Sequence, residues 1–291
     1  MIYLKSFKLL SEGKESQIMM EERRTCFSTF YPFGIFRYRN VPELEFEPIT
    51  IFSGGNGCGK TTILNVIADK LQLIRDSVYN TSSHFDTYVE HCKFELNSSV
   101  PKTSRIITSD DVFDYLLDIR NINLGIDNKR ENLFEEFEGY NELKWEDYPL
   151  KGIEDYENWK RFYDAKTAKS KSKYVKSRLM RNVEEKSNGE NALAYFTNSI
   201  TENALYLLDE PENSLSPQRQ LDLKNYIEDS ARFFGCQFII STHSPFLLSI
   251  NEAKIYDLDA EPPTAKKWTE LDNVKLYYNF FKENENEFKE C

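Results

Sequence analysis

Residues 54–62 read Gly-Gly-Asn-Gly-Cys-Gly-Lys-Thr-Thr and match the phosphate-binding loop pattern G-x-x-x-x-G-K-[ST]. An apolar, strand-like run at 49–52 precedes this loop, and a helical pattern of apolar residues at 63–71 follows it. That order of strand, loop and helix is the context that the pattern requires. The alternative, a chance glycine-rich turn, explains neither the flanks nor the further motifs described below. The sequence therefore predicts a site for nucleotide phosphates at the start of a helix.

The residue types of this loop suit phosphate binding. Glycines let the backbone curl until successive N–H groups point at one centre, and the helix N-terminus adds partial positive charge. The Lys60 ammonium can reach the outer phosphates, and the Thr61 hydroxyl can bind Mg²⁺. The residues expected to contact the nucleotide here are Gly54, Gly55, Asn56, Gly57, Cys58, Gly59, Lys60, Thr61 and Thr62.

Composition narrows the class of protein. The chain has 291 residues, enough for one large α/β domain with an insertion or for two small domains. Its net charge of −11 argues against nucleic-acid binding by the whole surface, although a local basic patch stays open. No apolar run is long enough to enter a membrane, and no signal peptide is expected. The five cysteines and three histidines show no metal-ligand spacing. We therefore expect a cytoplasmic protein with free thiols.

Strand and helix patterns alternate at both ends of the chain. Strands are expected at 2–9, 44–52, 105–108, 205–208, 237–240 and 255–258, and helices at 217–234 and 274–291. Residues 76–103 are polar and predicted to be irregular. Because strands that alternate with helices usually form parallel sheets, the sequence predicts an α/β fold with a mostly parallel sheet.

The middle of the chain differs from both ends. We expect an N-terminal core part at 1–111, a charged helical insertion at 112–186 and a C-terminal core part at 187–291. Within the insertion, 131–157 is rich in acids and 166–181 is rich in bases. The basic segment is either a solvated helix that pairs with the acidic stretch or a contact surface for nucleic acid.

Two further strands end in polar residues. Asp209 and Glu210 follow the buried strand at 205–208, at the strand end where α/β sheets place ligands. Asp209 is expected to hold Mg²⁺, and Glu210 to orient or deprotonate water. Taken alone, the two acids would be interpreted as a helix N-cap, but the phosphate loop upstream and His243 downstream favour the site. His243 follows the strand at 237–240 and is either a structural histidine or part of the same site.

These motifs together resemble the ATP-binding-cassette (ABC) class of P-loop ATPases rather than the hexameric AAA+ class. Residues 187–190, Ser-Asn-Gly-Glu, resemble its signature loop, 211–217 resemble its D-loop, and His243 resembles its switch histidine. More narrowly, 31–71 and 189–258 resemble a family of small, soluble bacterial ATPases of the SMC- and OLD-like kind. The resemblance does not cover the middle of the chain.

The resemblance implies an ABC-type P-loop NTPase with antiparallel N-terminal strands, a helical insertion, ATP and Mg²⁺ as ligands, and ATPase activity. It implies a head-to-tail homodimer in which the signature loop of one copy covers the nucleotide of the other. Glu210, His243 and Lys60 would be the catalytic residues, and Thr61 and Asp209 would hold the metal. The signature-loop residues expected at the nucleotide are Ser187, Asn188, Gly189 and Glu190.

The chain departs from the family pattern in several places. Lys186, rather than a leucine, precedes the signature serine. Cys58 stands where Ser or Ala is common, and is either a small-residue substitution or an oxidisable thiol. No glutamine marks the Q-loop, for which Asp110 or Asp111 is the positional candidate. Tyr31 is a candidate to stack on adenine, as is Phe33; the alternative for both is a place in the core.

Three functions compete. The first is a soluble ATPase switch or motor that acts on DNA or on a separate effector protein, in genome maintenance or phage (antiviral) defence. The second is the ATPase subunit of a membrane transporter, which the missing L-S-G-G-Q loop and the insertion disfavour. The third is a nucleotide-gated binding protein with little turnover, which the presence of Glu210 and His243 disfavours.

Overall fold

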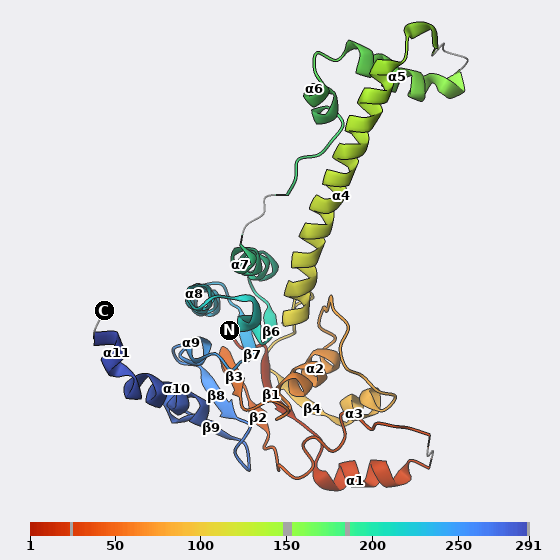
Figure 1. Ribbon diagram of the computed structural model, residues 1–291. Coiled ribbons are helices and arrows are strands. Elements are labelled where there is room, and N and C mark those ends of the chain that lie inside the picture. Colours follow the sequence, from red (N-terminus) through yellow and green to blue (C-terminus); the bar gives the residue numbers. More distant parts are fainter. Residues whose placement is uncertain (24–25, 148–152, 184–186, 290–291) are drawn as a thin grey trace. The chain divides into compact units, whose positions relative to one another are not determined.

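The computed structural model describes residues 1–23, 26–147, 153–183 and 187–289. The chain forms two compact units, one of Met1–Phe113 with Ser187–Cys291 and the other of Asp114–Lys186 (Figure 1). Helix α4 (Ser109–Glu142) begins in the first unit and continues into the second. The first unit holds both ends of the chain and all the strands that the structure describes.

A six-stranded, mostly parallel sheet forms the centre of the first unit. The strand order is β5 (Arg105–Thr108), β6 (Leu205–Asp209), β7 (Gln237–Ser241), β3 (Ile49–Ser53), β8 (Lys254–Asp257) and β9 (Thr264–Lys266). Only β9 runs antiparallel, at one edge of the sheet. Every residue of β3, β6 and β7 is buried, as expected for strands covered on both faces. The predicted α/β fold class is confirmed.

A second, antiparallel sheet contains the N-terminal strand, as the family resemblance implied. Strand β1 (Leu4–Lys8) lies between β2 (Leu44–Glu45) and β4 (Lys93–Leu96). The buried side chain of Gln237 joins the two sheets. Its Oε1 accepts from the backbone N–H groups of Tyr3 (2.8 Å) and Leu4 (2.9 Å), and its Nε2 donates to the Leu4 carbonyl (2.9 Å).

Two expectations about strands were wrong. The predicted single strand at 44–52 is two strands, β2 and β3, which belong to different sheets. Pro48 separates them, because it has no N–H group for a ladder bond; its carbonyl accepts from Phe238 N–H (2.8 Å). The region 76–103, predicted to be irregular, contains α3 (Phe85–His91) and β4. All four residues of β4 are exposed and two of them are lysine and glutamate, so its apolar signal is weak.

Helices cover both faces of the main sheet. Helix α2 (Lys60–Lys70) shares a core with Leu205, Leu207 and Ile239 on one face. Because side chains alternate along a strand, Tyr206 points to the opposite face, where its hydroxyl donates to the Thr201 carbonyl (3.0 Å) just after α7 (Asn188–Ser199). Helix α8 (Pro217–Phe233) packs beside α7 on this side, and α2 lies on the other (Figure 1).

The remaining helices of the first unit are short or peripheral. They are α1 (Glu12–Glu21), α9 (Pro245–Leu248), α10 (Asp272–Glu283) and α11 (Glu285–Lys289). The last two occupy the predicted C-terminal helix, whose final residues lie outside the described part of the chain. Among the described residues, no helix combines the length and apolar character needed to cross a membrane.

The second unit is mostly helical, as predicted. It contains most of α4, with α5 (Tyr156–Thr167) and α6 (Lys171–Lys176), around a small core that includes Leu133 and Tyr174. Part of the basic segment pairs with the acidic stretch: Lys171 forms an ion pair with Glu138. The Tyr174 hydroxyl donates to Glu136 Oε1 (2.7 Å). Residues 148–152 and 184–186 of the predicted insertion, Lys186 among them, lie outside the described residues.

Candidate nucleotide site

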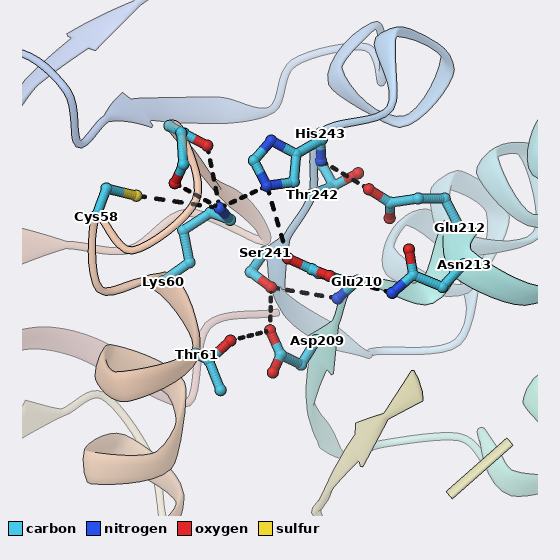
Figure 2. Close-up of polar contacts among 12 residues, drawn as sticks. Cys58, Lys60, Thr61, Asp209, Glu210, Glu212, Asn213, Ser241, Thr242 and His243 are labelled. Atoms are coloured by element: carbon cyan, nitrogen blue, oxygen red, sulfur yellow. Dashed lines mark hydrogen bonds and ion pairs between the residues drawn. The ribbon is translucent and has the colours of Figure 1, made fainter. Parts of the chain in front are cut away.

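The carboxyl ends of β3, β6 and β7 meet at one edge of the main sheet and position the predicted site residues. Phe52 of β3 pairs with Ser241 of β7, and Ser241 pairs in turn with Asp209 of β6. The phosphate loop therefore emerges beside the two strand ends that carry Asp209, Glu210 and, two residues after Ser241, His243. Figure 2 shows these side chains converging from separate elements.

Lys60 lies at the centre of this cluster and is only 5% exposed. Its Nζ donates to the carbonyls of Gly54 (3.0 Å) and Gly55 (3.2 Å) and lies 2.7 Å from His243 Nε2 (Figure 2). Because an ammonium group can only donate, Nε2 is the acceptor in that contact. A buried cation held by loop carbonyls is ready to exchange them for the stronger acceptors of a phosphate group.

Two glycines of the loop have no room for a side chain. Gly59 has φ +101°, and a Cβ there would lie 2.5 Å from the Phe36 ring. A Cβ on Gly54 would lie 2.7 Å from Cys58 Sγ. Gly55, Asn56 and Gly57 are exposed, so the loop opens to solvent between these tightly packed ends. Burial raises the pKa of the Cys58 thiol, which favours the small-residue interpretation over a reactive thiol.

Asp209 and Thr61 meet at the start of α2. The Thr61 hydroxyl donates to Asp209 Oδ1 (3.1 Å), and the Ser241 hydroxyl donates to the same oxygen. Burial raises the pKa of Asp209, and these two hydrogen bonds oppose the rise. A carboxylate beside a hydroxyl supplies the hard oxygen ligands that Mg²⁺ takes in nucleotide sites. The two predicted metal residues therefore fit Mg²⁺, although no group of three or more His, Cys, Asp or Glu residues suited to a metal occurs among the described residues.

Glu210 and His243 form the second half of the cluster. Glu210 takes left-handed backbone angles (φ 48°, ψ 53°), and its N–H donates to the Ser241 carbonyl (3.0 Å). Its Oε1 lies 3.6 Å from His243 Nε2, and its Oε2 accepts from Asn213 Nδ2 (3.1 Å). Both side chains are about one-third exposed, at 30% and 34%, so water can reach the carboxylate. Strained backbone of this kind often occurs at functional sites.

Sequence reasoning missed two residues that fix the phosphate loop from outside. Arg39 Nη1 donates to the carbonyls of Cys58 (2.9 Å) and Leu258 (3.1 Å). Asp259 Oδ2 accepts from the Gly55 N–H (2.7 Å). Neither residue belongs to a motif, and they come from distant parts of the chain. The one available signal was position, since Asp259 follows a predicted strand.

The aromatic residues before the loop have different surroundings. Phe33 is 8% exposed and packs edge-on against Tyr88, so it belongs to the core. Tyr31 is partly buried and stacks on Phe85, and its hydroxyl donates to Thr62 Oγ1 (3.2 Å). Thr62, expected at the nucleotide, thus has its hydroxyl bonded to Tyr31. Tyr31 reaches the phosphate-loop helix but has one ring face already packed.

The signature-loop residues lie at the start of α7, apart from the cluster around Lys60. Ser187 caps this helix: its Oγ accepts from Glu190 N–H (3.4 Å), and Glu190 Oε2 accepts from Ser187 N–H (3.1 Å). Arg219 of α8 donates to Glu190 Oε1 (3.1 Å). Gly189 lies close to the 211–217 segment: a Cβ there would be 3.8 Å from the Ser214 carbonyl oxygen. The signature and D-loop segments are therefore neighbours in this chain.

The Q-loop candidates lie where α4 begins. Asp111 is 5% exposed, and its Oδ2 accepts from the N–H (2.6 Å) and hydroxyl (2.9 Å) of Thr108. These bonds close the end of β5 onto the first turn of α4. Asp110 is exposed. Asp110 and Asp111 therefore lie next to the edge strand, where the chain continues into the insertion. The bonds of Asp111 to Thr108 give it a structural role at this position.

The fold and site define a P-loop ATPase. His243, after β7, and the adjacent acids Asp209 and Glu210, at the end of β6, lie beside the phosphate loop and the start of α2. A family model described as "ABC transporter" matches residues 43–213, and one described as "AAA ATPase domain" matches residues 190–248. Because the first model spans more than half of the chain, the protein belongs to this family of ATP-binding-cassette ATPases. It is an ATPase, and the recognition made from sequence is confirmed.

Solved structures that match the chain share little sequence with it. The Smc head domain of Pyrococcus furiosus, with an extended coiled coil and bound to the C-terminal domain of ScpA, is 14% identical, with TM-score 0.42, over 98% of this chain and 100% of that one. A nucleotide-free ATP-binding cassette from an ABC transporter is 15% identical, with TM-score 0.40, over 89% of this chain and 88% of that one. The search of curated proteins found no match.

Proposed function

We propose that this chain is a soluble, cytoplasmic ATPase that hydrolyses ATP between two copies joined head to tail. Closing and opening of that dimer would act on DNA or on a separate effector protein, in DNA repair or phage defence. One observation carries the proposal. Lys60, Glu210 and His243 converge in one chain, whereas the signature serine, Ser187, is bonded within its own helix cap. A second copy would supply the missing signature loop.

Each residue of the cluster has a role in this proposal. Lys60 and the loop N–H groups bind the phosphates, and Thr61 and Asp209 hold Mg²⁺, which neutralises phosphate charge when bound. Glu210 accepts a proton from the attacking water, and His243 contacts the γ-phosphate. Tyr31 contributes to the adenine side of the site. The exposure of Glu210 and its 3.6 Å separation from His243 Nε2 support these assignments.

The signature loop contributes from the partner. Helix α7 has 12 residues, and its N-terminal N–H groups favour an anion. Ser187 Oγ and the Gly189 N–H are assigned to the γ-phosphate, with Asn188 and Glu190 beside them. Glu190 already bonds to Ser187 and Arg219, so its part is to orient the loop rather than to meet the phosphate.

Two inactive variants that restore each other test the dimer. Lys60→Ala removes the cation of the phosphate loop, and Gly189→Asp puts a carboxylate at the signature loop, where a Cβ has ordinary contacts of 3.7–3.8 Å. Each variant alone should be inactive. A mixed head-to-tail dimer contains one intact site, so mixing equal amounts should regain a substantial fraction of native turnover. A mixture that stays inactive despite subunit exchange rules the shared site out.

The transporter alternative is consistent with the match of residues 43–213 to the ABC transporter family model. It predicts that the chain co-purifies with a membrane protein, whereas the proposal predicts a soluble partner or nucleic acid. A low-turnover binding protein would instead bind ATP and release it unhydrolysed. Affinity purification from detergent-solubilised cells, together with a single-turnover assay, separates the three.

Nucleic acid is a second partner that a specific observation supports. In the basic segment, Lys169, Lys173 and Lys176 are exposed, whereas Lys171 is paired with Glu138. If these lysines contact phosphates, affinity for DNA or RNA should fall steeply with salt, and changing all three to glutamate should flatten that dependence. Charge reversal at Lys275, Lys282 and Lys289 changes net charge equally and serves as the control. Absence of binding by the native protein at about 50 mM salt excludes this surface.

A further inference from the structure

The carboxylate of Glu212 is bonded to the backbone of the switch loop. Glu212 lies in the short 3-10 turn Pro211–Ser214, directly after Glu210. Its Oε1 accepts from the N–H groups of His243 (2.6 Å) and Ser244 (3.2 Å). Figure 2 shows this side chain reaching the His243 backbone from the side opposite Lys60. Its other oxygen, Oε2, is buried and has no hydrogen-bond partner in the described part of the chain.

The local backbone explains how Glu212 reaches that peptide. The left-handed conformation of Glu210 turns the chain back after β6, so that the following residues lie beside the end of β7. On the far side of the same loop, Ser244 Oγ caps α9 and donates to Gln220 Oε1 (2.6 Å). The loop between β7 and α9 is therefore fixed by side chains from two other segments.

Burying the Glu212 carboxylate is unfavourable for stability, so its position calls for an explanation other than packing. Burial raises the pKa of Glu212, and leaving one of its oxygens buried without a partner is destabilising. Two charge-assisted hydrogen bonds offset this cost, and both go to consecutive N–H groups at the switch loop. The first of them belongs to His243, whose imidazole lies between Lys60 Nζ (2.7 Å) and Glu210 Oε1 (3.6 Å).

We infer that Glu212 is a positioning residue for ATP hydrolysis, whose carboxylate holds the His243 backbone so that the imidazole stays between Lys60 and Glu210. The inference rests on the proposed role of His243 at the γ-phosphate. Glu212 itself does not touch the nucleotide. Its effect belongs to kcat, because the phosphate loop that binds ATP does not depend on it.

Two substitutions distinguish the effect of side-chain length from the effect of charge at position 212. Glu212→Gln keeps the length of the side chain and an oxygen that accepts both N–H bonds, so kcat should stay within about threefold of native. Glu212→Asp keeps the charge but is one methylene shorter, so kcat should fall about tenfold or more, while KM for ATP changes less than about threefold. The opposite order, with a slow E212Q and an active E212D, would overturn the inference, because charge rather than position would then matter.

A double-mutant cycle tests whether Glu212 acts through His243. E212D combined with His243→Ala should be no slower than His243→Ala alone, since the shared effect is already lost. Rate losses that multiply would contradict the inference. Glu228→Asp is the matched control, because Glu228 Oε1 likewise accepts a backbone N–H, that of Asn251 (2.8 Å), away from the site. It should leave kcat unchanged.

The outcomes distinguish this inference from the function on which it rests. A His243→Ala variant with native turnover would remove His243 from the mechanism and leave the Glu212 bonds purely structural. If His243→Ala is slow but E212D hydrolyses ATP at the native rate, Glu212 is not a positioning residue, while the role of His243 stands. Thermal unfolding checks that each variant is folded. If E212D does not fold, a large loss of kcat in folded E212Q still refutes the inference.

Discussion

The phosphate-loop cluster and the signature loop, both in the same compact unit, differ in what their side chains are bonded to. In the cluster, Lys60, His243 and Glu210 come from three separate elements, and His243 Nε2 lies 2.7 Å from Lys60 Nζ and 3.6 Å from Glu210 Oε1. At the start of α7, Ser187 and Glu190 bond to each other, and Glu190 also bonds to Arg219 of the next helix. One region brings distant residues together, and the other is a local helix cap.

That difference indicates which part of the chemistry one chain can supply. The cluster has a cation, a hydroxyl–carboxylate pair and a partly exposed carboxylate, the groups that the proposal assigns to triphosphate binding and to activation of water. In the proposed dimer, the helix N–H groups at the start of α7 serve the nucleotide bound by the other copy. Nucleotide binding should therefore survive changes at α7, and turnover should not.

The largest effect is expected from Lys60→Ala. The phosphates lose their buried cation, so ATP binding measured by calorimetry should fall below detection. Lys70→Ala, at the other end of the same helix, removes a lysine that donates to the carbonyls of Val89 and Glu90, and should leave binding unchanged. Micromolar ATP affinity in the Lys60 variant would show that ATP does not bind at the phosphate-loop cluster.

Glu210→Gln should affect the chemical step and spare binding. Loss of a catalytic base typically slows a reaction by about a hundredfold or more, and the amide keeps the shape of the site. The variant should bind ATP normally, hydrolyse it at least about a hundredfold more slowly, and accumulate as an ATP-bound dimer in light scattering. Native turnover would exclude Glu210 as the base, and a strictly monomeric ATP complex would count against the shared site.

Ser187→Ala tests the role of the signature loop. It removes one hydrogen bond to a charged group, worth roughly 1.5 kcal/mol or more, so kcat should fall by about tenfold. ATP affinity of the isolated chain should not change. Arg219→Ala should give a smaller loss, about threefold, because its bond to Glu190 is partly exposed. Arg232→Ala on the same helix is the control, and equal effects of both arginines would remove Arg219 from the signature loop.

The smallest effect concerns stability and pH. Burial raises the folded-state pKa of Asp209, so the protonated form stabilises the fold below the unfolded-state pKa, and this contribution is lost as pH rises through the folded-state value. Asp209→Asn should therefore raise the melting temperature near neutral pH, measured without Mg²⁺, and the gain should vanish in acid. Asp272→Asn, at a 94% exposed side chain, should show no such trend. A pH-independent gain would contradict this account.

The fold was predictable where a strand reads as a continuous apolar run. Strands β6 and β7 are buried at every position and lie close to their predicted ranges. The apolar pattern did not predict the strand correctly where the strand is only partly buried or exposed. Strand β4 exposes all four residues, and the run at 44–52 hid a break because Pro48 is surrounded by strand-forming residues. Which strand joins which sheet depends on contacts such as those of Gln237, which no local pattern reports.

The same contrast holds for the site. Lys60, Thr61, Asp209, Glu210 and His243 carry motif spacing, and the structure brings them together. Arg39, Asp259 and Glu212 act through one or two hydrogen bonds to backbone groups distant in sequence. Such a bond needs only one polar side chain at the right place, so even for Glu212, which lies in the D-loop-like segment, the sequence does not reveal the bonding partner. The adenine side is not fixed either, because Tyr31 packs on Phe85 and bonds to Thr62.

The two outer contacts of the phosphate loop bear on how the chain can be divided. The segment matched by the ABC transporter family model, 43–213, contains the loop, but Arg39 precedes it and Asp259 follows it. A fragment trimmed to those limits, or a loop transplanted into another scaffold, would keep every residue of the motif and lose the bonds that shape Gly55 and Cys58. Any fragment made to study or transplant the loop should therefore extend at least from residue 39 to residue 259.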